Sequence, residues 1–580
     1  MKNKEIAGKF LEIAHLLEIK GENSFKIRSY EKAAETIESL DHDIKDDYIS
    51  GNLEELDGIG KGIAAKISEY LSAGKITKLE ELRKEIPRGL LEMLKVPGLG
   101  PAKIRLIHKE LGIKTMRGLD IAARRGELAA LSGLGEKSAA NILRGLEIAS
   151  RLDGRLLMST AENMADDFLE VIRKDKSCRA ALACGSVRRG CETVGDIDLL
   201  AVSETPEKII DTFVKIDGVE KVTSSGPTKA SVYTAGDVQI DLRVVAPASF
   251  GAAMLYFTGS KEHNIALRKR ASAMGCTLNE YALSDQKSGE YRAGETEKDV
   301  YKRLGLDYIP PELRENRGEI EQASRHALPS LIEAKDIKGD LHLHSVYSDG
   351  AVEIRGLAAR ASELGYEWIG SCDHSMSLTI ARGLSVKNLM KKKKEIESLN
   401  KTSRVRILFG AEVDILSDGS LDYPDEILKE LDVCLGAVHA VFNQSPEVLN
   451  KRIMRAMDNP YLDVLAHPTA RLIGKRPPLA LDMEKVTAKA AEKNIILEVN
   501  AFPDRRDLKE EHIRMALAKG VMLSLGSDAH ALHHMDNMRY GLMNLRRAGC
   551  GKRDVLNTRT AAELSKIISS RRRKANGYSA

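Results

Sequence analysis

The stretch GSVRRGCETVGDIDLL occupies residues 185–200 and contains two aspartates, Asp196 and Asp198, that flank one isoleucine. Side chains two apart on a strand point to the same face, so these two carboxylates are expected to stand together while Ile197 and Leu199 face a core. Like charges at that separation repel each other unless a cation lies between them. The stretch therefore predicts a metal-binding strand end.

A third carboxylate and a glycine-serine turn extend this predicted site. Asp241 lies in VQIDLRVV, and three carboxylates on adjacent strands can hold two divalent ions about 4 Å apart. Gly185 and Ser186 end a preceding strand and can offer amides and a hydroxyl to phosphate, with Arg188 and Arg189 adding charge-assisted bonds. A D-x-D pair by itself is more often a solvated strand end, but the combination favours nucleotidyl transfer.

The segment LYFTGSKEHNIALRKRA at 255–271 makes the prediction more specific. With the D-x-D block, the N-terminal hairpins and the closing NEYAL and EKDVYKRLGL, it resembles the family X DNA polymerases, which include DNA polymerase beta, from about residue 5 to 315. The resemblance implies a nucleotidyltransferase palm with a mixed sheet, in which Asp196, Asp198 and Asp241 bind two Mg²⁺ or Mn²⁺ ions. It implies gap-filling DNA synthesis in repair.

The same resemblance implies further contacts around the incoming nucleotide. Tyr256 and Phe257 would pack against the sugar and exclude ribose, although a core aromatic pair is the alternative for these two residues. Asn264 would contact the incoming base, and Arg268 the template strand. The full set of implied nucleotide-binding residues is Gly185, Ser186, Arg189, Gly195, Tyr256, Phe257, Gly259, Asn264 and Arg268.

The first 150 residues contain a repeated pattern in which a Gly-x-Gly turn opens a helix. The copies are LDGIGKGIAAKI at 56–67, VPGLGPAKIRLI at 96–107 and LSGLGEKSAANIL at 131–143. Such a turn exposes backbone N–H groups that suit a phosphate, although one copy alone more simply ends one helix and begins another. Three copies predict helix-hairpin-helix elements that hold a nucleic-acid backbone, with a monovalent cation at the turns. The predicted DNA-contacting glycines are Gly58, Gly60, Gly98, Gly100, Gly133 and Gly135.

A lyase activity is also implied by the family resemblance. Well-known members use an N-terminal lysine that forms a Schiff base with deoxyribose phosphate. Lys66 lies at the matching position and Lys26 at an accompanying phosphate-binding position, but Gly62 stands where a second lysine is expected. A solvated helix lysine is the alternative for Lys66, so the lyase stays an open hypothesis.

The C-terminal part, from residue 339 to about 570, alternates short apolar strands with helices, which predicts a parallel α/β barrel. Histidines and acids gather at the predicted strand ends in HLHSVYSDG, CDHS, GAVHA, LAHPTA and GSDAH, and Glu412 is expected to follow the strand ILFGA. Imidazole and carboxylate donors suit Mn²⁺, Zn²⁺ or Fe²⁺. A lone histidine at a strand end is usually structural, but six with three acids indicate a metal centre. The nine candidate ligands are His342, His344, Asp349, His374, Glu412, His439, His467, Asp528 and His530.

This pattern is similar to the polymerase and histidinol phosphatase (PHP) family. The resemblance implies a distorted (β/α)7-type barrel with up to three metals that hydrolyses phosphoesters. Bacterial and archaeal family X polymerases carry such a domain, which implies a 3′–5′ exonuclease and an abasic-site endonuclease in some. Two alternatives stay open: a small-molecule phosphatase fused to a non-polymerase nucleotidyltransferase, and a binding module with inactive sites.

The predicted order of domains follows from these motifs and from the break at Pro310–Pro311. It comprises an N-terminal 8-kDa-like helical domain at 1–85, a second hairpin domain at 86–150, the palm at 151–255, a nucleotide- and template-binding subdomain at 256–315, a linker at 316–338, the PHP domain at 339–570 and a disordered basic tail at 571–580.

Composition adds limits to this prediction. Of 580 residues, 43% are hydrophobic and 30% charged, and the net charge is only +4, so DNA binding must rest on local placement of charge. Seven scattered cysteines without a CxxC pair predict reduced thiols. No apolar run approaches the roughly 20 residues of a membrane span, and no signal-peptide core is seen. We expect a cytoplasmic monomer whose partners are gapped, nicked or primer-template DNA and deoxynucleoside triphosphates, with no membrane partner.

Overall fold

The computed structural model describes residues 3–40, 42–94, 96, 99–132, 134–136, 138–139, 141–143, 146, 154–234 and 237–575. The chain divides into two compact units, residues 1–153 with 471–478 and residues 154–470 with 479–580. Two of the predicted DNA contacts, Gly98 and Gly133, lie outside the described residues. None of the helices in the described ranges combines the length and apolar character that a membrane crossing requires.

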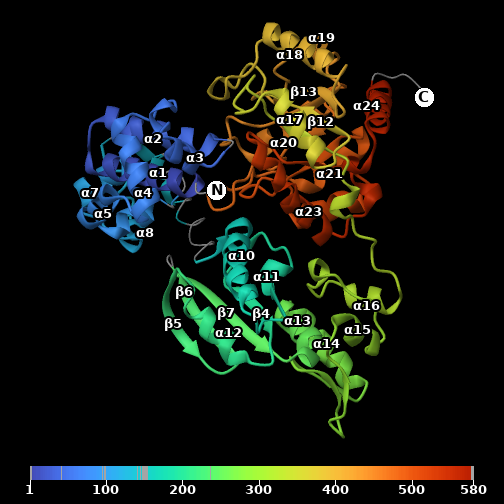
Figure 1. The fold of residues 1–580 in the computed structure, drawn as a ribbon. Coiled ribbons are helices and arrows are strands. Elements are labelled where there is room, and N and C mark those ends of the chain that lie inside the picture. The colour runs from blue at the N-terminus through green and yellow to red at the C-terminus, as the bar shows by residue number, and fades with distance from the viewer. Residues whose placement is uncertain are drawn as a thin grey trace. The chain divides into compact units, whose positions relative to one another are not determined.

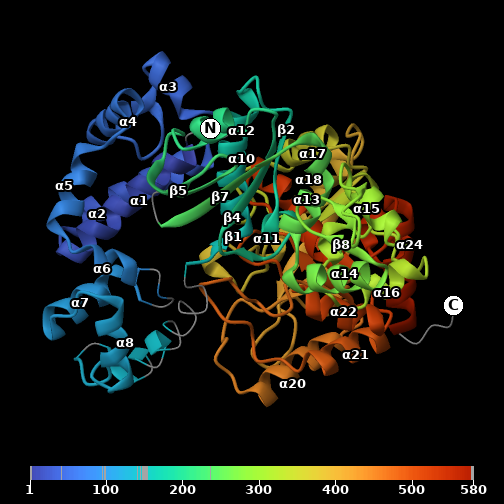
Figure 2. The ribbon, with the colours of Figure 1, turned by 90° about the horizontal axis from the view of Figure 1, so that it is seen from below.

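The first unit is helical, as predicted. Its two longest helices, α1 (Asn3–Lys20) and α2 (Ser24–Ser39), lie side by side (Figures 1 and 2). In α1, apolar side chains such as Phe10, Ile13 and Leu17 recur at helical spacing and are fully buried in one cluster that continues through the later helices. Those helices are α3 (Ile44–Ser50), α4 (Lys61–Ala73), α5 (Thr77–Glu85), α6 (Arg88–Met93), α7 (Pro101–Leu111) and α8 (Met116–Arg124).

The second unit begins with a mixed five-stranded sheet in the order β2-β4-β7-β6-β5. Only the central pair β4–β7 is parallel; the other neighbours are antiparallel. Helices α10 (Met158–Lys174) and α12 (Pro206–Phe213) pack on one face, where Phe168 and Phe213 meet Leu199 and Leu242. The strands are β2 (Ala180–Ala183), β4 (Ile197–Val202), β5 (Val219–Ser225), β6 (Lys229–Thr234) and β7 (Val238–Val245).

Beyond this five-stranded sheet, which we call the palm sheet, the chain forms a smaller α+β subdomain. Helix α13 (Phe250–Thr258) packs on the opposite face of the palm sheet, with Ala253 against Leu200 and Val245. Helix α14 (Lys261–Ala273) follows it and contributes Leu267 to a separate core. The remaining elements are β8 (Cys276–Leu278), β9 (Leu283–Asp285), β10 (Tyr291–Ala293), α15 (Glu297–Arg303) and α16 (Glu319–Ser324).

The C-terminal domain is a parallel sheet of seven strands whose spatial order equals their order in the chain. A parallel bridge from Leu343 to Ala529 joins the ends of the first and last strands, so the sheet is nearly closed into the predicted barrel. The strands are β11 (Gly339–Leu343), β12 (Trp368–Ser371), β13 (Arg406–Asp414), β14 (Val433–Ala437), β15 (Val464–Leu465), β16 (Ile496–Asn500) and β17 (Leu523–Gly526). The connecting and flanking helices include α17 (Ile354–Glu363), α18 (Val386–Leu399), α20 (Pro446–Met457), α21 (Met483–Lys493), α22 (Glu510–Ala518) and α23 (Met538–Arg547).

The prediction of a disordered tail is wrong for residues 571–575. Helix α24 (Ala561–Ala575) continues through them, and the side chains of Arg571 and Arg572 both bind Asp463, with 2.8 Å between Arg571 Nη2 and Asp463 Oδ1. Asp463 is fully buried, and a buried carboxylate requires a cationic partner. The arginines therefore fasten the last helix to the barrel. Residues 576–580 lie outside the described part.

Candidate active sites

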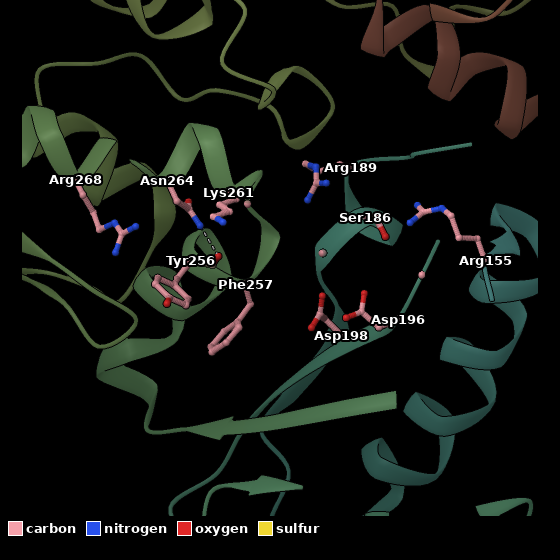
Figure 3. Close-up of a pocket in the computed structure, with 13 residues that line it drawn as sticks. Arg155, Ser186, Arg189, Asp196, Asp198, Tyr256, Phe257, Lys261, Asn264 and Arg268 are labelled. Atoms are coloured by element: carbon pink, nitrogen blue, oxygen red, sulfur yellow. Dashed lines mark hydrogen bonds between the residues drawn. The ribbon is translucent and has the colours of Figure 1, made fainter. Parts of the chain in front are cut away.

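The three predicted palm carboxylates lie near enough to affect one another electrostatically, although their oxygens are not gathered as closely as the donor groups of the barrel. Parallel pairing of β4 and β7 sets Asp198 opposite Asp241, and Asp196 stands just before β4 (Figure 3). Burial, with Asp196 and Asp241 adding to it, raises the pKa of Asp198 to about 7. The three carboxylates offer negatively charged oxygen ligands, and such ligands suit divalent cations.

The turn after β2 lies directly against these carboxylates. Gly185 has φ +57°, and a Cβ atom on it would come within 2.2 Å of Asp198 Oδ2. Any other residue at position 185 would therefore push the carboxylate aside. Glycine is required at position 185 because the turn approaches Asp198 so closely.

A cleft of about 570 Å³ opens above Asp196 and Asp198 (Figure 3). It brings together all nine residues of the implied nucleotide-binding set, but not Arg188, and Arg155 and Lys261 also line it. Asp241 is not one of its lining residues; its place beside Asp198 comes from the strand register. The predicted residues on the cleft wall are Gly185, Ser186, Arg189, Gly195, Tyr256, Phe257, Gly259, Asn264 and Arg268.

The aromatic pair of α13 stands at the wall of the cleft and is only half-buried. The rings of Tyr256 and Phe257 meet edge to face with 5.1 Å between centroids. Phe257 also packs against the core between α13 and the sheet, so the alternative of a core aromatic holds in part for this residue. Asn264 donates from Nδ2 to the carbonyl of Tyr256 at 2.6 Å, while its buried Oδ1 has no hydrogen-bond partner among the described residues. The wall of the cleft thus contains one buried acceptor without a protein partner among the described residues.

Arg188 does not share the role that the sequence indicated for it. Its guanidinium donates to both oxygens of Glu297, at 2.8 and 2.7 Å, and to the hydroxyl of Thr258. Glu297 is only 4% exposed and also accepts from the buried Arg314. This network uses Arg188 to join the palm to the next subdomain, which leaves Arg189 as the arginine on the cleft wall.

The histidines and acids of the barrel form one continuous buried cluster. Three sets of donor atoms each lie within 4.8 Å of one another, namely His344 with Asp349, His374 and His530; His342 with His344 and Asp528; and His374 with Glu412 and His439. His467 joins them through its Nε2, which is 2.7 Å from Glu412 Oε1. All nine predicted ligands therefore meet at one end of the barrel. Glu412 lies within β13 rather than after it.

Electrostatics of this cluster fit bound cations. Burial lowers the pKa of His344 to about 3, so its imidazole is neutral and can donate a lone pair. Burial opposes protonation of His374 too, yet Glu412 and Asp349 raise its pKa to about 10. Bound cations would take the place of such protons. Several buried donor atoms make no well-aligned hydrogen bond within the described ranges, although some lie close to an oppositely charged group; they are His342 Nε2, His344 Nδ1 and Nε2, His374 Nδ1, Glu412 Oε2 and His467 Nδ1.

The hairpins of the first unit have the predicted local form. Helices α4 and α7 begin after Gly60 and Gly100, whose Cβ positions would meet nothing within 4 Å, so the approach to the first helical turns is open. Lys66, on α4, donates to the carbonyl of Gly62 at 2.9 Å and lies 5.8 Å from the centre of the Tyr30 ring. Gly58 lies shortly before α4, and Gly135 lies in a helical turn within the third copy of the motif.

Comparison with known proteins covers most of the chain. Residues 253–315 match the DNA polymerase beta thumb, residues 340–502 the PHP domain, residues 1–76 a helix-hairpin-helix domain and residues 90–147 a SAM-like helix-hairpin-helix tandem. The DNA polymerase/3′-5′ exonuclease PolX of Bacillus subtilis (strain 168) is 37% identical over 571 residues, which are 98% of this chain and 99% of that protein. The chain belongs to the PolX family of family X DNA polymerases.

Shorter relatives of this PolX chain match its PHP part. A probable phosphatase of Thermoanaerobacter sp. (strain X514) is 31% identical over 249 residues, or 41% of this chain and 97% of that protein. A probable phosphatase of Clostridium novyi (strain NT) is 30% identical over 212 residues, or 34% of this chain and 81% of that protein. Because the PolX match spans both parts of the chain, the alternative of a phosphatase fused to a non-polymerase nucleotidyltransferase is not favoured.

Several residues of the PolX sites were missed from the sequence. Arg155 lies far from any recognised motif, and Lys261, within the quoted segment, was not distinguished from its charged neighbours. In the barrel, Glu498 accepts from His342 Nδ1 at 2.7 Å and Asp414 binds His439 Nδ1 at 2.5 Å. These acids orient imidazoles for metal binding. The available signals were the place of Asp414 on the same strand as Glu412 and that of Glu498 on the strand between β15 and β17.

Proposed function

We propose that this chain is a DNA-directed DNA polymerase that fills short gaps in DNA repair and also carries a PHP-domain 3′–5′ exonuclease. The observation that supports synthesis most strongly is the cleft in which two of three clustered carboxylates face a wall of phosphate-binding groups. Neither the carboxylate cluster nor the cleft alone would suffice. Together they suit a triphosphate that reacts with a 3′ hydroxyl.

In the proposed polymerase site each side chain has a role set by its position. Asp196, Asp198 and Asp241 hold two Mg²⁺ or Mn²⁺ ions, which when bound activate the primer hydroxyl and neutralise triphosphate charge. Ser186 and Arg189 bind phosphate oxygens, with the backbone of Gly185, Gly195 and Gly259 allowing close approach. Tyr256 and Phe257 contact the sugar, Asn264 the base and Arg268 the template.

In the proposed nuclease site the nine barrel residues hold up to three Mn²⁺, Zn²⁺ or Fe²⁺ ions. When bound, these cations neutralise phosphodiester charge and favour deprotonation of the attacking water. Glu498 and Asp414 keep His342 and His439 in the orientation that presents their other nitrogen to the centre. The same site is the candidate for abasic-site cleavage.

The proposed partners are gapped, nicked or primer-template DNA and deoxynucleoside triphosphates, bound by a monomer in the cytoplasm. The test is a pair of assays on the purified full chain, one for nucleotide insertion into a gap and one for 3′ resection, each with Mg²⁺ or Mn²⁺. Both activities are expected. Absence of insertion at every metal concentration would reject the polymerase assignment.

The hairpins are expected to hold DNA through backbone amides, with a monovalent cation at the turn. Gly60→Val or Gly100→Val should then lower affinity for gapped DNA by about tenfold, because the branched side chain covers the backbone N–H groups that donate to phosphate oxygens. Binding should weaken steeply with salt and vary little with sequence, as measured by fluorescence anisotropy. Gly8→Val, at an exposed helix glycine with equally open surroundings, is the control. Equal affinity in all three variants would reject the hairpin role.

Lys66 is proposed as the lyase nucleophile, with Lys26 binding phosphate. Burial lowers the pKa of Lys66, and Lys26 and Lys78 act in the same direction, which favours the neutral amine that attacks an aldehyde. Borohydride should trap the chain on a 5′-deoxyribose-phosphate end. Lys66→Ala should abolish the adduct, whereas Lys61→Ala, at an exposed lysine on the same helix, should retain it. Adducts of equal yield in both variants would exclude Lys66.

A further inference from the structure

One face of helix α23 in the C-terminal domain packs against the palm. Tyr540, Met543, Asn544 and Arg547 follow helical spacing and share that face. Tyr540 is 2% exposed, belongs to the hydrophobic cluster of the palm sheet and donates its hydroxyl to Glu162 at 2.9 Å. The side chain of Met543 packs closely against Gly190. A Cβ atom placed on Gly190 would lie 3.2 Å from Met543 Cβ.

Two arginines of the C-terminal domain hold the palm turn that carries Ser186 and Arg189. Arg547 donates from Nη1 to the carbonyl of Arg189 at 2.8 Å. Arg506 donates to the next two carbonyls, that of Gly190 at 2.9 Å and that of Cys191 at 2.8 Å. Three consecutive carbonyls of this turn therefore accept hydrogen bonds from guanidinium groups of the other domain.

The side chain of Arg189 is linked to the same helix through one carboxylate. Glu315 lies 3.1 Å from Arg189 Nε and 3.0 Å from Arg547 Nη2, both through its Oε1. Arg189 also donates to the carbonyl of Thr258. Both the backbone and the guanidinium of Arg189 are thus connected to Arg547, and Arg189 is the arginine on the wall of the nucleotide cleft.

We propose that Arg547 of the C-terminal domain is a positioning residue for nucleotide binding in the palm. It acts through Arg189 in two ways: it orders the turn by binding a carbonyl, and it shares the charge of Glu315, so that Arg189 can turn to a phosphate. Without Arg547, Glu315 would hold Arg189 more strongly. The proposal rests on the polymerase function proposed above and adds that the nuclease domain sets the polymerase's affinity for nucleotide.

The experiment compares full-length Arg547→Gln with Arg546→Gln. Arg546 is the neighbouring residue on α23 and makes its own contacts, to Glu312 at 2.7 Å and to the carbonyl of Ile332 at 2.8 Å, neither of which involves the 186–191 turn. We expect Arg547→Gln to raise KM for the incoming nucleotide about tenfold, the size of one charge-assisted hydrogen bond, with kcat within about twofold. Arg546→Gln should stay near the wild-type KM. Arg547→Lys should recover part of the loss, because it keeps the charge but not the fork of donors.

A second measurement does not depend on activity. Backbone hydrogen exchange over residues 186–192 should be faster in Arg547→Gln than in Arg546→Gln, and 3′ resection should be equal in the two. An unchanged KM and unchanged exchange in folded Arg547→Gln would overturn the proposal, as would equal effects in both variants, which would indicate a general loosening between domains. If the wild-type chain inserts no nucleotide, the polymerase assignment fails and the exchange comparison still decides whether Arg547 orders the turn.

Discussion

Asp198→Asn is expected to lower nucleotide insertion by roughly three orders of magnitude or more, because it removes a charged oxygen donor from the centre of the carboxylate cluster. The fold should persist. Since the folded state raises the pKa of Asp198 to about 7, its ionised form is disfavoured by folding; this penalty is absent well below the unfolded pKa, grows as pH rises from the unfolded pKa to about 7, and is constant above that pH. The neutral amide should therefore be at least as stable as wild type at pH 8.

The measurement is single-nucleotide insertion on gapped DNA, combined with thermal unfolding at pH 8. Asp217→Asn, at an exposed aspartate of the same domain, is the matched control and should insert at the wild-type rate. Resection at 3′ ends should be unaffected in both variants. If Asp198→Asn retained more than about a tenth of the wild-type insertion rate, the loss would be too small for removal of a catalytic metal ligand, and the role proposed for Asp198 would be wrong.

Glu412→Gln should have the second large effect, which is loss of bound metal and of 3′ resection. The carboxylate is 1% exposed and stands among three imidazoles, 2.7 Å from His467 Nε2, 2.9 Å from His374 Nδ1 and 3.1 Å from His439 Nε2. Its charge compensates for cations at this end of the barrel, and an amide of the same shape does not. Resection should fall by about three orders of magnitude.

Elemental analysis of the purified variant, alongside the resection assay, tests this expectation. Glu397→Gln, at an exposed position on the nearby helix α18, should keep both metal and activity. Gap filling should stay near normal in Glu412→Gln, because the proposed metal ligands of the polymerase site lie in the palm. A variant that binds no metal yet still resects 3′ ends would place hydrolysis elsewhere.

Much of both sites could be predicted because their donors follow short-range rules. Asp196 and Asp198 share a face by the period of a strand, and the barrel histidines recur at strand ends, so their local spacing predicts convergence once the strands are parallel. Glu412 was expected just after its strand and lies within it, because β13 extends to Asp414. The sequence could not separate Arg188 from Arg189, because which of two adjacent arginines meets Glu297 depends on a residue more than a hundred positions away.

The contacts between domains were beyond prediction for a similar reason. Along α23 the spacing of Tyr540, Met543 and Arg547 is that of any amphipathic helix, and nothing in it tells a helix packed on its own barrel from one that also covers the palm. The tail shows the same limit. A run of arginines at 571–573 suggested a solvated end until the structure placed the buried Asp463 beside it.

The strand order of the barrel has a consequence for the timing of synthesis on the ribosome. The proposed metal ligands come from both the first strand region, at His342 and His344, and the segment after the last strand, at Asp528 and His530, and the two ends meet around the Leu343–Ala529 bridge. A nascent chain can complete the palm and its carboxylates while the barrel is still open. The metal centre, by contrast, cannot be assembled until β17 has left the exit tunnel. During translation the carboxylates of the proposed synthetic site can therefore assemble before the proposed degradative site, whereas the turn that carries Arg189 gains its contacts to Arg547 only afterwards.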